Sequence, residues 1–363
     1  MGIQCGIVGL PNVGKSTLFN ALTNAGAVTE NYLFATVEPN VGVARVPDVR
    51  LDAIAAIARP AEVVPTTIEL VDIAGLVAGA SRGEGLGNRF LARIREVDAV
   101  AHVVRCFENP DVTHVAGPVD PRRDIDTIAT ELALADLATV ERALERARQK
   151  TRTGDKQATG ALATLERLEA ELGAGRPARV VPLTDAERPL VRDLFLLTAK
   201  PTMFIANVGD SGAPGDPQAA VVAEIAAAEG AAVVVVAGRI ESEIAELAAE
   251  DKAPFLFEIG ESEPGLDRVI RAAYRLLGLN TFFTQGEKQV RAWTFRGGMT
   301  ASQCAGIIHS DFERGFIRAE VIAYDDFIRH GGEGGAKEAG RWRLEGRDYL
   351  VAEGDVILFR FNV

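Results

Sequence analysis

One stretch near the start of the chain combines glycines, a lysine and a hydroxyl at fixed spacing. Residues 9–17 read Gly-Leu-Pro-Asn-Val-Gly-Lys-Ser-Thr, which fits the phosphate-binding pattern G-x-x-x-x-G-K-[ST]. The pattern follows the apolar run Ile3–Leu10 and opens a helical stretch, Ser16–Thr23, so backbone N–H groups would face bound phosphates. Lys15 can reach the β- and γ-phosphates, and the Ser16 hydroxyl can bind magnesium. The pattern therefore predicts that the following residues bind ATP or GTP: Asn12, Val13, Gly14, Lys15, Ser16 and Thr17.

A carboxylate at the end of a second apolar stretch completes the expected metal site. Thr67–Asp72 has the composition of a buried strand and ends in Asp72, and Gly75 follows three residues later. After a phosphate loop, such a carboxylate can hold magnesium through a water molecule, and a glycine N–H can meet the γ-phosphate. Thr36, in the loop after the first helix, can complete the magnesium shell. We expect Ser16, Thr36 and Asp72 to hold magnesium, and Lys15 and Gly75 to act on the γ-phosphate.

The elements that must position these residues alternate between strand and helix. Strand patterns at Ile3–Leu10, Thr67–Asp72 and Ala99–Val104 resume at Thr202–Asn207 and Ala232–Ala237, with helical stretches between them. This alternation predicts the α/β class, with a parallel-rich sheet joined by right-handed crossovers. We assign residues 1–122 and 200–277 to one P-loop nucleotide-binding domain.

A helical insertion, residues 123–199, separates the two parts of that domain. Asp126–Lys150 and Ala161–Leu172 are rich in Ala, Leu, Glu and Arg with apolar residues at helical spacing, and Gly173–Pro177 breaks the pattern. We predict an antiparallel, coiled-coil-like hairpin of helices. The pattern is compatible both with a spacer whose charged face is solvated and with a binding arm.

The last segment, residues 278–363, has a different character. Its strand patterns surround a helix predicted over Ala301–Ile308, and Thr300 with Gln303 supplies a capping box for that helix. The strands are predicted at Ala292–Phe295, Phe316–Ala323 and Asp355–Phe361. We expect a small mixed sheet with one main helix, folded as a separate domain.

Composition excludes several classes of protein. The 363 residues include 39 Lys and Arg against 51 Asp and Glu, a net charge of −12, which argues against a general polyanion binder, although a local basic patch could contact RNA. The three cysteines have no metal-ligand spacing and imply no disulfide framework. The longest apolar run, Ala231–Ala237, is too short to cross a bilayer, and we expect no signal peptide before Ile3. We expect a cytoplasmic protein with no membrane contact and no sequence-specific DNA partner.

Longer strings of sequence resemble the YchF group of Obg-like ATPases, and the similarity runs along essentially the whole chain. It rests on the phosphate loop and four further strings: 34–40 (FATVEPN), 72–76 (DIAGL), 105–109 (RCFEN) and 311–320 (DFERGFIRAE). The resemblance implies a nucleotide domain with a helical insertion, a C-terminal TGS domain of β-grasp type, and ATP hydrolysis that regulates binding to the ribosome. It also implies that Thr36 is the switch threonine on magnesium.

One departure from ordinary GTPases bears on hydrolysis. Leu76 stands where Ras-like enzymes have a glutamine, and a leucine cannot orient the attacking water. The resembled family has a histidine in the loop that here contains His114, which makes His114 the candidate; the alternative is an ordinary surface-loop histidine. The resemblance also implies that Asn12 helps hold a potassium ion beside the phosphates.

The base-reading segment departs from the guanine readers as well. Residues 207–210 read Asn-Val-Gly-Asp, where guanine readers have N-K-x-D, and the resembled family has Glu in the last position. Val208 replaces the lysine that braces the phosphate loop. Asn207 could bond the adenine edge and Val208 could pack on the base, whereas Asp210, a guanine-reading element, should turn toward solvent or a backbone N–H if adenine is bound. We therefore predict that ATP binds at least as tightly as GTP.

Three classes of function remain open from the sequence. The first is an ATPase switch acting on the ribosome, and the second is a GTPase switch of the same mechanism. The third is a binding module in which the TGS-like domain docks a partner and hydrolysis is vestigial. Competition between ATP and GTP distinguishes the first two, and a hydrolysis-deficient variant that retains function would favour the third.

Overall fold

The computed structural model describes residues 3–24, 40–73, 86–109, 117–152, 156–210 and 215–362. These residues divide into two compact units. The first unit comprises Met1–Val43 and Glu69–Ala273, and the second comprises Ala44–Ile68 and Tyr274–Val363.

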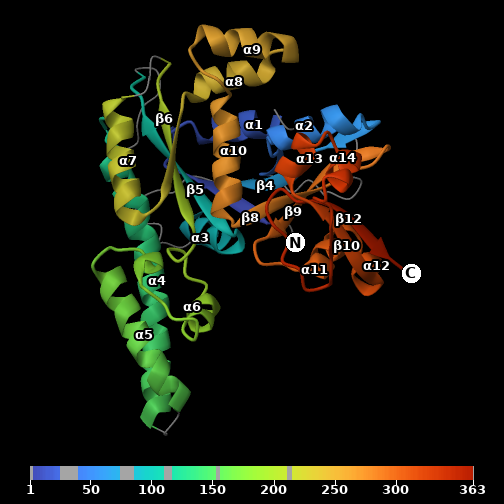
Figure 1. Ribbon diagram of the computed structural model, residues 1–363. Helices are drawn as coiled ribbons and strands as arrows, with labels where there is room; N and C mark the ends of the chain where they lie inside the picture. Colours follow the sequence, from blue (N-terminus) through green and yellow to red (C-terminus); the bar gives the residue numbers. More distant parts are fainter. Residues whose placement is uncertain are drawn as a thin grey trace. The chain divides into compact units, whose positions relative to one another are not determined.

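The first unit is built on a six-stranded sheet with the strand order β2-β4-β1-β5-β6-β7 (Figure 1). Its strands are β1 (Gln4–Val8), β2 (Val41–Arg45), β4 (Thr67–Asp72), β5 (Ala99–Cys106), β6 (Thr202–Val208) and β7 (Ala232–Val236). The pairs β1–β4, β1–β5, β5–β6 and β6–β7 are all parallel, as the alternating sequence predicts. Every residue of β5 is buried, including His102 and Arg105, which explains why its other six residues are apolar on both faces of the strand rather than on alternate ones.

The first unit also contains helices outside the inserted hairpin. They are α1 (Lys15–Asn24), α3 (Leu86–Glu96), α6 (Arg188–Asp193), α7 (Pro217–Glu229), α8 (Gly238–Glu246), α9 (Ala249–Glu258) and α10 (Gly265–Leu276), with a short 3₁₀ turn, η1, at Ala178–Val180. Helix α7 packs along β6 and β7, and its alanines allow close approach to the sheet. Helix α1, which follows the phosphate loop, packs against α8. Because α8 follows β7, this contact places the phosphate loop near the end of β7.

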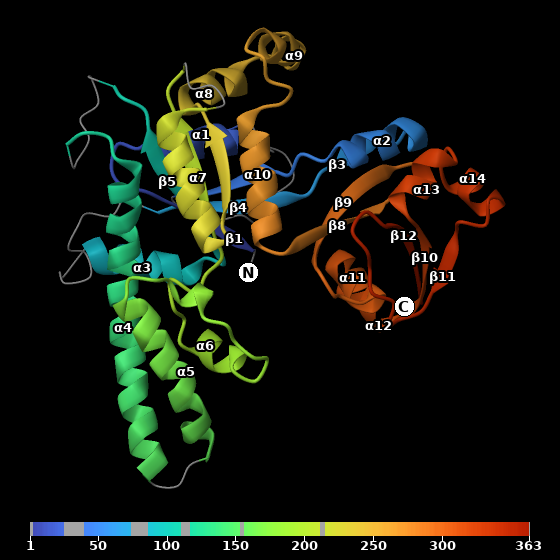
Figure 2. The same ribbon diagram turned by 60° about the vertical axis from the view of Figure 1, so that its left-hand side comes forward.

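The helical insertion forms the predicted antiparallel hairpin, α4 (Pro121–Arg152) and α5 (Lys156–Gly173), which extends away from the sheet of its unit (Figures 1 and 2). An apolar cluster that includes Val140, Leu144 and Leu168 closes the two helices on each other. At the base of the hairpin, the buried carboxylate of Asp136 accepts hydrogen bonds from the backbone N–H groups of Leu197 and Thr198. The hairpin is therefore tied to the segment that leads into β6.

The second unit contains a second six-stranded sheet, with the order β11-β10-β12-β8-β9-β3. Its strands are β3 (Glu62–Val64), β8 (Leu279–Thr284), β9 (Gln289–Arg296), β10 (Phe316–Ile322), β11 (Arg343–Glu345) and β12 (Val356–Phe361). Its helices are α2 (Val49–Ala58), α11 (Ala301–Ile308), α12 (Ser310–Arg314), α13 (Tyr324–Arg329) and α14 (Glu333–Glu338). Parallel and antiparallel pairs are mixed, and the capping box of Thr300 and Gln303 starts α11, as the sequence predicts.

Residues 44–68 lie in a different unit from the one that we predicted. Residues 44–68 were assigned to the nucleotide-binding domain, but α2 and β3 belong to the second unit. Leu51 and Ile54 of α2 are buried in an apolar cluster with Phe283 and Val290, and β3 extends the second sheet by pairing in parallel with β9. The chain thus leaves its first sheet after β2, contributes one helix and one strand to the C-terminal unit, and returns as β4.

Among the residues that the structure describes, none of the helices has both the length and the apolar character needed to cross a bilayer.

Candidate nucleotide-binding site

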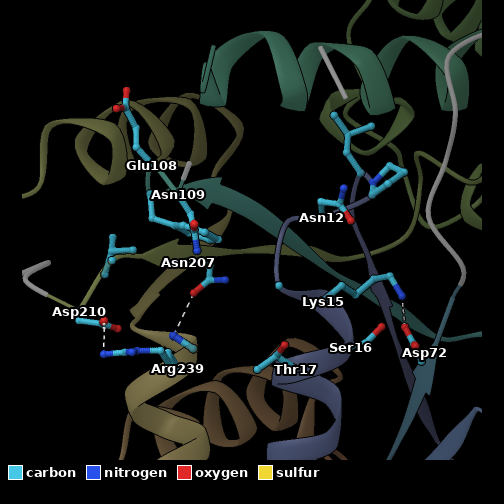
Figure 3. A pocket seen from close by; sticks show the side chains of 17 residues that line it. Asn12, Lys15, Ser16, Thr17, Asp72, Glu108, Asn109, Asn207, Asp210 and Arg239 are labelled. Atoms are coloured by element: carbon cyan, nitrogen blue, oxygen red, sulfur yellow. Dashed lines mark hydrogen bonds and ion pairs between the residues drawn. The ribbon is translucent and has the colours of Figure 1, made fainter. Parts of the chain in front are cut away.

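A single cavity of about 970 Å³ lies at the carboxyl ends of the strands of the first sheet. Its wall is formed by segments that follow β1, β5, β6 and β7 and by Asp72, the last residue of β4. Ligands in parallel α/β sheets bind at this edge, because the loops that leave neighbouring strands converge there. In Figure 3, Lys15, Ser16 and Asp72 lie together on one side of the cavity, and Asn207, Asp210 and Arg239 lie together on the other. The cavity therefore has two chemically different ends.

The phosphate loop joins β1 to α1 through two residues with positive φ. Asn12 has φ 64° and Gly14 has φ 87°, conformations that direct successive backbone N–H groups inward before the first turn of α1. A Cβ atom on Gly14 would lie 2.2 Å from Nδ2 of Asn207, so only glycine fits at this position. Both the backbone conformation and the close approach explain the second glycine of the motif.

Lys15, Ser16 and Asp72 supply the chemistry of the phosphate end. The Lys15 ammonium is largely buried and donates a hydrogen bond to Oδ1 of Asp72, so the lysine of the loop and the carboxylate of β4 are in direct contact (Figure 3). The Ser16 hydroxyl lines the same cavity. One hydroxyl and one carboxylate are oxygen ligands of the kind that magnesium uses when phosphate oxygens and water complete its shell, so these residues fit the expected metal. Among the described residues no group of three or more His, Cys, Asp or Glu side chains could hold a metal by itself.

Asn207 joins three segments of the site. Its side chain is buried, donates from Nδ2 to the Val13 carbonyl oxygen at 2.9 Å, and accepts at Oδ1 from the Gly238 N–H at 3.0 Å. A Cβ on Gly238 would lie 2.9 Å from that same Oδ1. Asn207 therefore fixes the phosphate loop to the start of α8, a bracing role that the sequence analysis associated with the lysine of N-K-x-D.

Arg105, at the end of β5, is a second brace that the sequence analysis did not single out. It is 1% exposed, and it donates from Nη1 to the Asn12 carbonyl oxygen at 3.2 Å and from Nε to the Phe107 carbonyl oxygen at 3.0 Å. Its guanidinium also lies 4.5 Å from the centre of the Phe107 ring. These contacts connect the phosphate loop to the segment Phe107–Asn109, which forms another part of the cavity wall.

At the other end of the cavity, Val208 and Asp210 differ in their surroundings. Val208 is buried in an apolar cluster with Phe204 and Val222, so most of its side chain supports α7 rather than facing the cavity. The Asp210 side chain is 45% exposed and forms an ion pair with Arg239, with Oδ2 and Nη2 2.5 Å apart (Figure 3). Asp210 is thus partly exposed and paired with a guanidinium rather than with a backbone N–H, and its orientation beside a bound adenine stays a prediction.

The structure brings most of the expected site residues into this one cavity. They are Asn12, Gly14, Lys15, Ser16, Thr17, Asp72, Asn207, Val208 and Asp210. Val13 is buried and takes part through its carbonyl oxygen. Thr36, Gly75 and His114 lie outside the described residues. Gly238 and Arg239 were not anticipated, and their position directly after β7, the last strand of a parallel sheet, is the signal that could have indicated them.

Comparison with known proteins extends these observations to the whole chain. A family model described as 50S ribosome-binding GTPase matches residues 4–153, and the YchF-GTPase_C model, described as a protein of unknown function, matches residues 279–362. The chain is 60% identical to "Ribosome-binding ATPase YchF" of Haemophilus influenzae and 54% identical to the protein of that name from Bacillus subtilis, with 100% of each chain covered.

Solved structures agree with the sequence comparison. The structure of the Schizosaccharomyces pombe YchF GTPase superposes with a TM-score of 0.88 at 33% identity, covering 99% of this chain and 98% of the other. The phosphate loop, the inserted hairpin and the C-terminal mixed sheet follow one another in the expected order. With this level of identity along the full length, the chain belongs to the YchF family.

Proposed function

We propose that this protein is a magnesium-dependent, ATP-hydrolysing P-loop switch that regulates a process on the ribosome. The observation that carries the proposal is the cavity, in which Lys15 and Asp72 stand at one end and Asp210 with Arg239 at the other. This arrangement suits a nucleotide whose triphosphate lies along the start of α1 and whose base lies between the ends of β6 and β7.

Binding of the triphosphate requires Lys15 to exchange partners. Its ammonium now donates to Asp72 and would instead donate to oxygens of the β- and γ-phosphates. Asp72 would then be free to hold magnesium through a water molecule, and the Ser16 hydroxyl would also bind the metal. Magnesium bound there would neutralise charge on the phosphate oxygens. Asp72 would therefore pair with Lys15 before the triphosphate binds and assist metal binding afterwards.

The remaining roles at the phosphate end stay proposals. Thr36 would complete the magnesium shell, and the N–H of Gly75 would meet the γ-phosphate. Asn12, whose carbonyl oxygen accepts from Arg105, would help to hold a potassium ion beside the phosphates. His114 would position the attacking water, since Leu76 has no polar group for that task.

The relatives from Haemophilus influenzae and Bacillus subtilis are named "Ribosome-binding ATPase YchF", and we propose the ribosome as the partner on this ground. A switch of this kind binds its partner differently with triphosphate and diphosphate, so hydrolysis changes the affinity for the partner. We place the protein with these relatives in the cytoplasm.

GTP is the second candidate substrate, because Asp210 occupies the position that reads guanine and the Schizosaccharomyces pombe relative is described as a GTPase. We favour ATP, since Asp210 is engaged by Arg239 and the lysine of N-K-x-D is missing. Calorimetric titration with each triphosphate should give an ATP affinity at least equal to that of GTP, and phosphate release should follow addition of ATP. A GTP affinity more than about tenfold higher, a difference of about 1.4 kcal/mol, would make the protein a GTPase instead.

Replacing Ser16 with alanine should weaken magnesium-dependent binding of ATP and affect ADP less, because Ser16 would help to hold the metal that would neutralise the charge of the triphosphate. The measurement is titration of both nucleotides with and without magnesium. Thr17→Ala is the comparison variant: Thr17 lines the same cavity and is expected to bind the nucleotide but not the metal, so its loss should weaken ATP and ADP alike. If magnesium makes no difference to the unaltered protein, then the metal role of Ser16, Thr36 and Asp72 is wrong.

A further inference from the structure

We propose that Arg239 is a positioning residue that sets the base preference of this site by holding Asp210 away from guanine. The inference rests on the proposed function, because it concerns the nucleotide base bound in the same cavity. No local sequence pattern indicates a role for the Arg239 side chain.

The ion pair occupies the part of Asp210 that guanine would need. A guanine-reading aspartate accepts hydrogen bonds from N1–H and the exocyclic amine with both of its carboxylate oxygens. Here Oδ2 of Asp210 lies 2.5 Å from Nη2 of Arg239, and both side chains belong to the wall of the cavity. To read guanine, Asp210 must turn away from Arg239 or share Oδ2 with it, whereas adenine has no pair of donors that requires the carboxylate.

The backbone that carries Arg239 is fixed by its neighbours. Gly238 donates its N–H to the buried Asn207, and Glu241 accepts from the N–H groups of Gly265 and Leu266 at the start of α10. Asn207 lies on β6, three residues before Asp210. Because the ends of β6 and α8 are joined in this way, Arg239 and Asp210 face each other from two braced elements rather than from two unconnected loops.

The expected effect is modest, because the pair is exposed. The side chain of Arg239 is 72% exposed and that of Asp210 is 45% exposed. Exposed ion pairs contribute about 0.2–1 kcal/mol, which corresponds to a change in relative affinity of up to about 5-fold. Glu243 also lies near the guanidinium, 4.0 Å from Nε, and could hold Arg239 on α8 if Asp210 turned away.

The test is calorimetric titration of the full chain with ATP and with GTP. Arg239→Ala should shift the ratio of the two affinities toward GTP by about 2- to 5-fold. Arg239→Lys, which keeps a cation, should restore part of the original ratio. Raising the salt concentration should shift the ratio in the unaltered protein and have less effect in Arg239→Ala, because exposed ion pairs are screened by salt.

Two further variants isolate the contact with Asp210. In an Asp210→Asn background, Arg239→Ala should leave the ratio unchanged, because the carboxylate that it holds is already gone. Glu243→Gln is the matched control, since it removes one negative charge near the same guanidinium without touching Asp210. An unchanged ratio in Arg239→Ala, or the same shift in the Asp210→Asn background, would overturn the inference while leaving the ATPase proposal intact. Failure of the unaltered protein to bind either nucleotide would overturn both.

Discussion

Replacing Lys15 with alanine should weaken ATP binding by on the order of 10²- to 10³-fold. Loss of one member of a buried, charge-assisted hydrogen bond costs about 2–5 kcal/mol, and the ammonium is the main side-chain partner of the β- and γ-phosphates in this type of loop. The substitution also removes the partner of Asp72, a carboxylate with 16% side-chain exposure. In the proposed triphosphate complex Lys15 has already left Asp72, so the weaker binding comes from the lost contacts with the phosphates.

Lys15→Met separates charge from packing, since it keeps an unbranched side chain of similar length without the ammonium. We expect both variants to lose ATP binding in calorimetry, while their thermal unfolding without nucleotide should differ, because the methionine preserves the packing of a largely buried side chain. Full ATP affinity in Lys15→Ala would refute the assignment of the phosphate loop. Retained affinity in Lys15→Met alone would instead mean that shape, not charge, is what the loop requires.

Much of the phosphate end could be predicted from the sequence because its determinants are local. The spacing of Gly9, Gly14 and Lys15 describes one strand-to-helix turn, and Asp72 ends an apolar strand just as its pattern indicates. The capping box that starts α11 is equally local. In each case the residues that define the feature are neighbours along the chain, so a short window contains the whole physical argument.

The unit to which residues 44–68 belong could not be predicted in the same way. Strand β3 is only three residues long, Glu62–Val64, and its partner β9 lies more than two hundred residues later in the sequence. Helix α2 carries apolar side chains suitable for burial, but nothing in its own sequence specifies that Leu51 and Ile54 pack against Phe283. Pairing of this kind depends on tertiary contacts that a local pattern does not encode.

The end of the cavity expected to bind the base could not be predicted from local sequence either. Asn207 was predicted to face the base, yet its amide is used on the Val13 carbonyl and the Gly238 N–H. That outcome depends on the convergence of β1, β6 and β7, which the strand order establishes and the motif does not. Arg239 likewise enters the cavity only because β7 is the neighbour of β6. The role of Asn207 in binding a nucleotide base stays a prediction.

Hydrolysis requires a group that orients or deprotonates water near the γ-phosphate. Among the described residues of the cavity wall, Asp72 accepts from Lys15 and is the expected partner of the metal-bound water, and Asp210 is paired with Arg239 at the other end. Glu108 is the remaining carboxylate of the wall, and Figure 3 places it away from Lys15 and Asp72. His114 follows Asn109, a residue of the wall, by five positions in the sequence, and it stays the candidate that the resemblance implies.

We therefore expect His114→Ala to lower the rate of ATP hydrolysis by about 10- to 10⁴-fold with nucleotide affinity near that of the unaltered protein, because the imidazole would act on water rather than on the nucleotide. Single-turnover phosphate release measures the rate, and calorimetry measures the affinity.

His114→Asn distinguishes the two possible roles, since an amide can orient water by hydrogen bonding but cannot accept its proton. Retention of most of the rate in His114→Asn would indicate positioning, and loss in both variants would indicate proton transfer. Glu108→Gln is the control for the other candidate carboxylate: a full rate in His114→Ala together with a large loss in Glu108→Gln would assign the role to Glu108 and leave His114 as a loop residue.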